Sequence, residues 1–186
     1  ELKERLGATV IYVTHDQEEA LAMADRVAIL HQGRIEQIDA PRRLYEAPRT
    51  AFVAGFMGDL NQFEGRVVSV ADSAVDVSIH GCSALAMQAD GAAPLSVGAP
   101  VIVGVRPEHL HLTKANAASE NGLRARIVRS SFSGADISVF AAIEDGPLVQ
   151  AIVRLDSPAA SLRDGENVSL SWPRERAVAF SGSAVA

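Results

Sequence analysis

A histidine that directly follows an apolar run is the residue best placed for chemistry in this sequence of 186 residues. Residues 10–13 (VIYV) are β-branched or aromatic without polar alternation, which predicts a strand covered on both faces in a parallel sheet. His15 would lie just past the carboxyl end of that strand, the edge at which open α/β sheets bind ligands. An imidazole there could contact a phosphate or an activated water, or it could satisfy a hydrogen bond at the strand end.

The residues after His15 predict the start of a helix. Asp16 is among the residues favoured at a helix N-cap, and Glu19 follows three positions later, which is the spacing of a capping-box pair. Asp16 and Glu19 would therefore position the helix that follows His15.

The gap-free run over residues 13–58, VTHDQEEALAMADRVAILHQGRIEQIDAPRRLYEAPRTAFVAGFMG, resembles a segment of ABC-transporter ATPases. In the ATP-binding subunits of bacterial importers, this segment follows the Walker B strand and the D-loop. By this resemblance His15 is the switch histidine of the H-loop, which in the family contacts the γ-phosphate of ATP and helps to order the attacking water. The resemblance therefore implies that His15 is both a catalytic and a cofactor-binding residue, and it implies no metal ligand.

The other motifs of an ATP site are missing from the sequence. It has no G-x-x-x-x-G-K-[ST] phosphate loop, and the family's glutamine loop, LSGGQ-type signature and acidic Walker B strand are absent too. We therefore expect a carboxy-terminal fragment of a longer subunit. The parent would be an ATPase that uses ATP and Mg²⁺, whereas the fragment alone would be inactive and would bind neither tightly.

The composition limits the classes of partner and the location. A formal net charge of −6, without a stripe rich in Lys and Arg, argues against nucleic acid as a partner. Cys82 is the single cysteine, which excludes an internal disulfide, and no apolar run approaches the roughly 20 residues that span a bilayer. A cytoplasmic protein is therefore expected, and the resemblance places it peripherally on the inner face of the cell membrane.

The pattern of apolar and polar residues in the sequence changes at Gly58. Residues 1–58 would be an α/β remnant, the carboxy-terminal part of an ABC nucleotide-binding domain from the H-loop onward. Residues 59–186 contain many short alternating segments between Gly, Pro, Asp and Ser, which predicts an all-β domain folded as an antiparallel barrel. Within it, VGVRPEHLHL, RSSFSGADISVF and LSWPRERAVAF resemble the TOBE-type regulatory domain of these importer ATPases, which has an OB-like fold.

Short elements are predicted in the first part. Residues 27–30 and 34–38 indicate a hairpin, a helix follows with Pro41 in its first turn, and another helix begins at Thr50. An apolar stripe on that last helix is expected to pack it onto the next domain. The stripe consists of Phe52, Val53 and Phe56.

In the second part, the alternation predicts a series of strands. They fall at residues 63–70, 74–79, 101–105, 109–112, 123–128, 137–143, 148–153 and 168–172. FEGRVVSVADSAVDVSIHG and LRARIVRSSFSGADISVFAAIEDG both read as strand, turn and strand, which suggests a barrel assembled from two roughly equivalent portions.

A charged and histidine-containing stretch in the second part has two interpretations. Pro107 holds an extended exit from a strand, so Arg106 and Glu108 could pair across a domain interface or lie on a loop as solvated charges. His109 and His111 are two positions apart and could share a strand face. No third ligand follows at a sensible spacing, which favours paired surface or barrel-lining histidines over a metal site.

The resemblance implies the ATP-hydrolysing subunit of an ABC importer, to which this fragment would contribute the H-loop and a regulatory and dimerisation domain. The ending LSWPRERAVAF is most similar to ATPases of polyamine (spermidine and putrescine) importers. Importers of ferric iron, sugar or glycerol phosphate are alternatives, as is a stand-alone regulatory or ligand-binding β module. The implied partners are a second ATPase subunit in a homodimer, the inner-membrane permease subunits and, indirectly, a periplasmic solute-binding protein.

Overall fold

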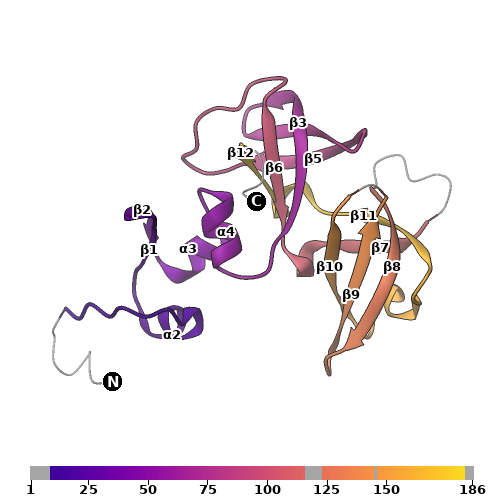
Figure 1. Cartoon of the computed structure of the whole chain (residues 1–186), viewed down its shortest axis with the longest axis horizontal. Coiled ribbons are helices and arrows are strands. Elements are labelled where there is room, and N and C mark those ends of the chain that lie inside the picture. The colour runs from indigo at the N-terminus through magenta and orange to yellow at the C-terminus, as the bar shows by residue number, and fades with distance from the viewer. Residues whose placement is uncertain (1–8, 116–122, 145, 183–186) are drawn as a thin grey trace.

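The structure is a computed structural model that describes residues 9–115, 123–144 and 146–182. Short helices and a hairpin lie at one end of the molecule, and two β units follow them (Figure 1). The last strand of the chain returns to the first of these units. No helix in the described ranges is long and apolar enough to cross a membrane.

The amino-terminal part contains short helices around one hairpin. Its elements are α2 (Gln17–Met23), β1 (Val27–His31), β2 (Arg34–Asp39), α3 (Pro41–Glu46) and α4 (Ala51–Phe56). The predicted hairpin is confirmed, because β1 and β2 pair antiparallel. Its turn uses Gln32 and Gly33 with φ values of 48° and 76°, and positive φ at both central residues is what a type I′ turn requires. The predicted helix starts at Pro41 and Thr50 are confirmed as well.

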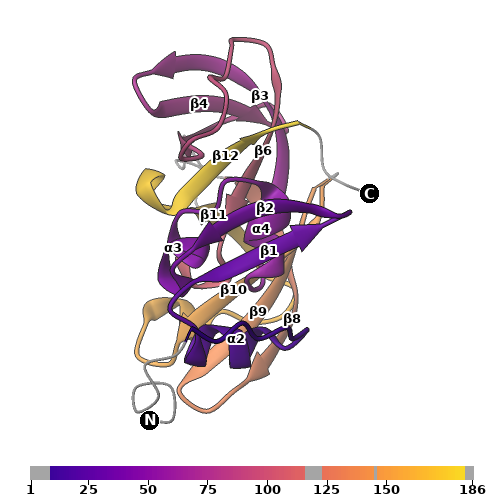
Figure 2. The same cartoon turned by 90° about the vertical axis from the view of Figure 1, so that its left-hand side faces the viewer.

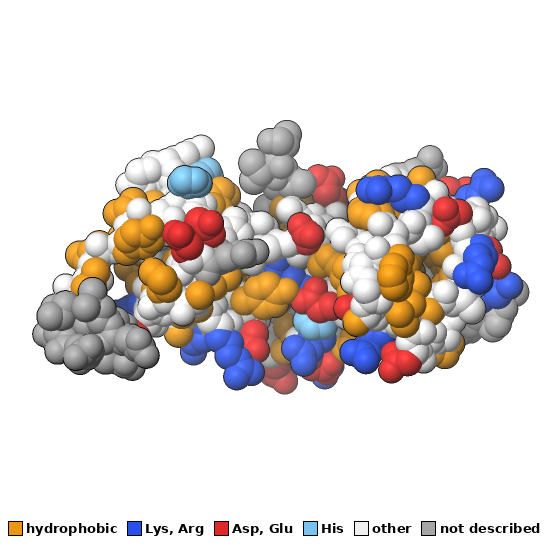
Figure 3. All heavy atoms as spheres, turned by 90° about the horizontal axis from the view of Figure 1, so that it is seen from below, with side chains coloured by type: hydrophobic (Ala, Val, Ile, Leu, Met, Phe, Trp, Pro, Cys, Tyr) orange, Lys and Arg blue, Asp and Glu red, His pale blue; other side chains and the backbone are white. Residues whose placement is uncertain are grey.

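Residues 10–13 do not form the covered strand that their apolar character predicts. Their side chains are between 61% and 90% exposed. A parallel strand covered on both faces needs neighbours, and none of the strands in the described residues pairs with this segment. The α/β part of the expected fold is therefore not confirmed. Hydrophobic side chains, orange in Figure 3, are accordingly present on the surface at the end of the molecule that the amino-terminal elements form.

The apolar stripe of α4 packs onto the hairpin, so the prediction that it packs onto the next domain is wrong. Val53 is fully buried in a cluster with Ile29, Leu44 and Met57. The Phe52 ring stacks on His31 with 3.8 Å between ring centroids, and Phe56 is 40% exposed. The contact with the β part comes instead from Ala54, which packs with Ala89 and Phe180. A small residue serves there because it allows the helix backbone to approach the barrel closely.

The first β unit is a closed barrel. Its strands are β3 (Asn61–Ala71), β4 (Ala74–Ile79), β5 (Cys82–Gln88), β6 (Pro100–Val105) and β12 (Ala177–Ser181), in the order β12-β5-β4-β3-β6. The last strand closes the barrel by pairing parallel with β5 and antiparallel with β6. The prediction of an antiparallel barrel is therefore wrong for one pair of strands. The alternation in the sequence also did not predict β5 and β12.

The second β unit is a five-stranded sheet. It contains β7 (His111–Lys114), β8 (Leu123–Phe132), β9 (Asp136–Ile143), β10 (Leu148–Arg154) and β11 (Asn167–Ser171), in the order β10-β9-β8-β11-β7. Single 3₁₀ turns join the elements at η1 (Pro107–His109), η2 (Pro158–Ser161) and η3 (Arg174–Arg176). The prediction of one barrel is therefore corrected to a barrel and a separate sheet.

The two similar sequence segments each supply one hairpin to a different unit. One is β3–β4 of the barrel and the other is β8–β9 of the sheet. Both long first strands carry a bulge, where the register shifts between Val67 and Ser69 and between Ile127 and Arg129. A bulge bends a strand and increases its twist, so each hairpin curls over the core.

The two β units are joined at the start of β3. The Asn61 side-chain amide donates to the Gln150 carbonyl oxygen, and its oxygen accepts from the Gln150 N–H, both at 2.8 Å. The amide thus completes the backbone pairing of an edge strand as a neighbouring strand would. Phe63 of the barrel also stacks on Trp172, with 5.0 Å between ring centroids. One hydrophobic core cluster contains buried residues of both units.

Candidate functional site

The structure places His15 on the surface between the extended segment and α2. Its side chain is exposed, and within the described residues it makes no hydrogen bond or ion pair. Figure 2 shows the extended segment running into α2 below the β1–β2 hairpin. The imidazole is therefore accessible to a ligand from outside the described part of the chain.

Asp16 caps α2 as predicted. Its Oδ1 accepts from the Glu19 N–H at 3.1 Å, so one of the orphan donors of the first turn is satisfied. The return bond of a capping box is absent, because the Asp16 N–H donates to Thr14 Oγ1 at 2.9 Å instead. The Glu19 carboxylate accepts from the hydroxyl groups of Tyr12 and Thr14, at 3.1 and 3.3 Å. These bonds hold the residues on both sides of His15 to the start of the helix.

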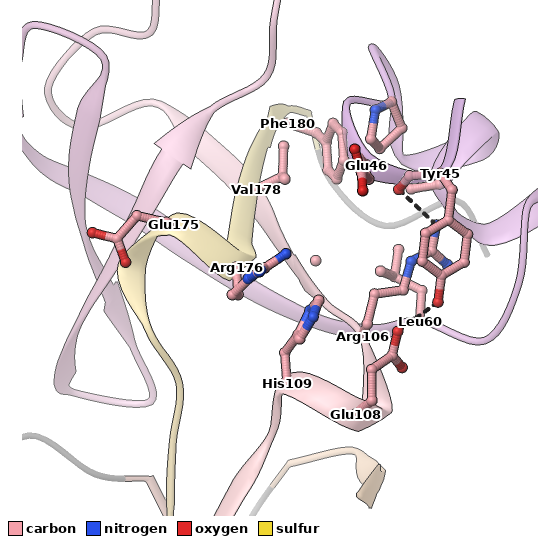
Figure 4. A pocket seen from close by; sticks show the side chains of 13 residues that line it. Tyr45, Glu46, Leu60, Arg106, Glu108, His109, Glu175, Arg176, Val178 and Phe180 are labelled. Carbon is pink, nitrogen blue, oxygen red and sulfur yellow. Dashed lines mark hydrogen bonds between the residues drawn. The ribbon is translucent and has the colours of Figure 1, made fainter. Parts of the chain in front are cut away.

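A second group of polar residues meets where the amino-terminal part joins the barrel. A cavity of about 200 Å³ lies there, with Tyr45 of α3 on one side. Arg106, Glu108 and His109 come from the corner between β6 and η1, and Phe180 of β12 lies at another wall. Figure 4 shows the side chains of Arg106, Glu108 and His109 projecting from this one corner, with Tyr45 opposite.

Arg106 is a buried cation that donates three hydrogen bonds at the joint. Only 5% of it is exposed. Its Nη1 donates to the carbonyl oxygens of Gly58 and Asp59 at 2.8 and 3.0 Å, and its Nη2 donates to the Tyr45 carbonyl oxygen at 3.4 Å. The guanidinium carbon also lies 4.1 Å from the centroid of the Tyr45 ring, in a cation–π contact. Burial lowers the pKa of Arg106, while Tyr45 and Glu108 oppose that effect.

Tyr45 connects the same corner through its hydroxyl group. The phenol donates to Glu108 Oε1 at 2.5 Å, the short distance expected for an O–H donor and a charged acceptor. Burial, the hydrogen bond to Glu108 and the Glu108 charge together raise the pKa of Tyr45 to about 12, and the Arg106 charge opposes them. The phenol is therefore a stable donor at neutral pH.

The interface interpretation of Arg106 and Glu108 is correct in part. Both residues act across the joint, but no salt bridge within the described residues links them to each other. Arg106 instead contacts the ring and the carbonyl oxygen of Tyr45, and Glu108 accepts from the Tyr45 hydroxyl group. Tyr45 was not identified from the sequence. The sequence did contain a signal, because Tyr45 directly follows the apolar Leu44 in a predicted helix. Adjacent helical residues point in different directions, so a helix that buries Leu44 in one cluster directs Tyr45 toward another neighbour.

The proposed common strand face for His109 and His111 is wrong. His109 lies in the η1 turn, and His111 is the first residue of β7. The Nδ1 atom of His109 is buried without a hydrogen-bond partner in the described structure. Burial lowers the pKa of His109, the Glu108 charge raises it, and the charges of Arg176, Arg106 and His111 lower it further.

The two groups differ in what they can do chemically. The joint contains a phenol, a guanidinium and a carboxylate that bind one another, which suits mechanical connection more than bond-breaking chemistry. No group of three or more His, Cys, Asp or Glu side chains in the described ranges could hold a metal ion. His109 Nδ1 at the joint also lacks a partner but is buried, whereas the His15 imidazole is exposed and has the donor and acceptor capacity that contact with a phosphate or water needs.

Comparisons with known proteins identify the second half of the chain. Residues 103–180, from within β6 to within β12, match the TOBE domain family. The barrel and sheet resemble a crystal structure of the cytoplasmic molybdate-binding protein ModG with molybdate bound, with a TM-score of 0.53. Identity to that protein is 16%, and the match covers 66% of this chain and 96% of that chain, so it shows the fold alone.

The whole chain is similar to ATP-binding proteins of importers. It is 36% identical over 174 residues to the spermidine/putrescine import ATP-binding protein PotA of Methylococcus capsulatus, covering 92% of this chain and 44% of that protein. It is 37% identical over 182 residues to PotA of Rubrobacter xylanophilus, covering 97% and 47%. For PotA of Vibrio cholerae the identity is 31% over 175 residues, covering 92% and 46%.

The chain thus spans about half the length of the curated relatives that it matches. Its residues 103–180 match the TOBE domain, and the predicted resemblance to the carboxy-terminal part of a bacterial importer ATP-binding subunit is confirmed.

Proposed function

We propose that this chain is the carboxy-terminal portion of the ATP-hydrolysing subunit of an ABC importer that energises the uptake of spermidine and putrescine. The observation that carries the proposal is the similarity to spermidine/putrescine import ATP-binding proteins, which extends over 92–97% of the chain. Residues 1–58 would complete the ATP-binding domain, and residues 59–186 would form its regulatory β domain.

His15 would be the catalytic residue that this portion contributes. The imidazole would contact the γ-phosphate and stabilise its charge during transfer to water, with Asp16 fixing the start of the following helix. The exposed, unpaired imidazole fits a phosphate contact. ATP supplies the phosphoryl group and Mg²⁺ neutralises its charge, and we assign their binding to the portion that the relatives have beyond the span of this chain.

The same proposal sets the partners and the location. Two such subunits would form a homodimer in the cytoplasm, on the inner face of the cell membrane, and would act on the permease subunits there. A periplasmic solute-binding protein would be an indirect partner. The TOBE match supports a regulatory rather than a catalytic role for the second half.

Substitution of His15 in the full-length subunit tests this function. We expect His15→Ala to lower the rate of ATP hydrolysis at saturating ATP by about 100-fold, because one stabilising contact to the transferring phosphoryl group is lost. Affinity for ATP should change by less than about threefold, since phosphate-loop contacts dominate binding. Steady-state turnover and nucleotide binding are measured on the same preparations.

A matched control is His111→Ala, which removes another exposed histidine, at the start of β7. Its turnover should equal that of the unchanged subunit. Unchanged turnover in His15→Ala would remove the assigned role of His15.

A further inference from the structure

Three residues tie the amino-terminal part to the barrel at one point, and we call Tyr45, Arg106 and Glu108 the junction clamp. Arg106 and Glu108 flank the buried Pro107, whose ring fixes the corner between β6 and η1. Both therefore project from one rigid corner of the barrel toward a single residue of α3. The clamp also holds the segment between α4 and β3, because Arg106 donates to the carbonyl oxygens of Gly58 and Asp59.

The helix that carries Tyr45 also packs into the rest of the amino-terminal part, and the Tyr45 ring itself lies against the cluster there. Leu44 is fully buried in the cluster with Ile29, Val53 and Met57. Leu21 of α2 packs against the same cluster. A continuous series of packed residues therefore runs from the barrel corner through α3 to α2, which begins two residues after His15.

We infer that the junction clamp positions α2, and with it His15, relative to the barrel, and that Tyr45 is a positioning residue for hydrolysis. This inference rests on the proposed function. Tyr45 does not reach the reacting atoms but acts on His15 through Leu44 and Leu21. Movement of the barrel would thereby change the alignment of His15, which gives the regulatory domain a route to the reaction.

Within the clamp, the buried contacts of Arg106 outweigh the other polar contact between α3 and the barrel, whereas the Glu108 carboxylate is itself exposed. Arg43 binds Asp90 at 3.1 Å, but these side chains are 57% and 67% exposed, and exposed ion pairs contribute little. Arg106 is buried, so the loss of its partners leaves an uncompensated charge. The cavity of about 200 Å³ beside the clamp provides space into which α3 can shift once the clamp is broken.

Hydrogen exchange on the 186-residue chain tests the mechanical step. Tyr45→Phe keeps the ring over Arg106 and removes only the hydrogen bond to Glu108. We expect amide exchange in α2 and α3 to accelerate about tenfold, with no change in β8 and β9, because a charge-assisted bond at the joint is lost. The matched control, Arg43→Gln, breaks the exposed pair on the same helix and should leave exchange in α2 unchanged. Unchanged protection of α2 in Tyr45→Phe would overturn the inference.

A spectroscopic measurement shows directly whether the Tyr45–Glu108 bond exists in solution. The sequence has two tyrosines, so Tyr12→Phe leaves Tyr45 as the sole phenol. In that background the pKa of Tyr45 should be about 12, and Glu108→Gln should lower it because the Glu108 charge, one of its causes, disappears. An ultraviolet titration in which Glu108→Gln leaves the pKa unchanged would refute the clamp, whatever the function of the chain.

Turnover of the full-length subunit tests the link to chemistry. Tyr45→Phe should lower kcat about tenfold while the KM for ATP stays within about twofold, because His15 acts mainly in the transition state. Arg43→Gln should leave both constants unchanged. If His15→Ala abolishes hydrolysis but Tyr45→Phe does not lower kcat, the inference fails and the proposed function stands. If His15→Ala has no effect, the proposed function fails, and the inference fails with it even where the exchange and titration results support a clamp.

Discussion

At the scale of single residues, His109 gives the junction a pH dependence. The pKa of His109 lies below its ordinary value of 6.5, chiefly because of burial, while Glu108 opposes the shift and Arg176, Arg106 and His111 add to it. The folded state therefore takes up a proton at lower pH than the unfolded chain. The contribution of His109 to the free energy of unfolding is therefore fully present above about pH 6.5, and it is lost as the pH falls through the lowered pKa of the folded state.

We therefore expect the free energy of unfolding to fall between pH 7 and pH 5, and to fall less in His109→Gln. Denaturant unfolding at several pH values measures both slopes. His80→Asn, a change at an exposed histidine in the turn between β4 and β5, serves as the control and should keep the slope of the unchanged chain, because His80 is not among the groups that shift the pKa of His109. Equal slopes for the unchanged chain and His109→Gln would show that His109 does not titrate with unfolding.

Residue-scale inference from the sequence succeeded where the interaction is local. Asp16 and Glu19 are three positions apart, so their capping bond follows from helix geometry alone. Tyr45 and Glu108 are separated by 63 positions, and nothing in their local sequence specifies that they meet. The joint therefore became visible only when the fold brought α3 to the barrel corner. The assignment of His15 to a phosphate rests on the resemblance and stays a prediction.

At the scale of elements, the hairpin β3–β4 depends on a glycine with no room for a side chain. A Cβ atom on Gly65 would lie 2.4 Å from Val77 Cγ1 and 2.8 Å from the Ser78 carbonyl oxygen. We expect Gly65→Ala to destabilise the chain by about 2 kcal/mol, because the backbone of β4 must move to admit the methyl group.

Gly55→Ala is the matched control for that substitution. Gly55 lies in α4, and the nearest atom to an added Cβ is Gln62 Nε2 at 3.8 Å. Alanine is favoured over glycine in a helix, so this change should stabilise the chain by up to about 1 kcal/mol. Unfolding midpoints compare the two variants, and a neutral Gly65→Ala would contradict the packing described for β3 and β4.

Element prediction from the sequence depended on neighbours that the pattern does not specify. β3, β4, β8 and β9 alternate clearly and were predicted close to their observed bounds. β5 (CSALAMQ) was missed because it contains few β-branched or aromatic residues. The apolar segment at residues 10–13 was predicted as a strand on its own composition, yet a strand forms only where a partner supplies hydrogen bonds, and no strand among the described residues pairs with it.

At the scale of the whole molecule, the resemblance to importer ATP-binding proteins was predictable from the sequence, but the β architecture was not. The motif around His15 and the stretch around Arg106 are specific enough to indicate an importer ATP-binding subunit with a TOBE domain. The division of the β strands between a barrel and a sheet depends on pairings such as β12 with β5, which are about 90 residues apart in the chain. Such long-range pairing leaves no local pattern.

Uptake of labelled spermidine and putrescine by intact cells tests the proposed function of the whole molecule most directly. We predict that deletion of the gene abolishes this uptake, that the unchanged gene restores it, and that His15→Ala, produced at the same level, does not. Uptake of ferric iron, sugars and glycerol phosphate should be unaffected. Normal polyamine uptake in the deletion strain, or loss of one of those other solutes instead, would contradict the assignment.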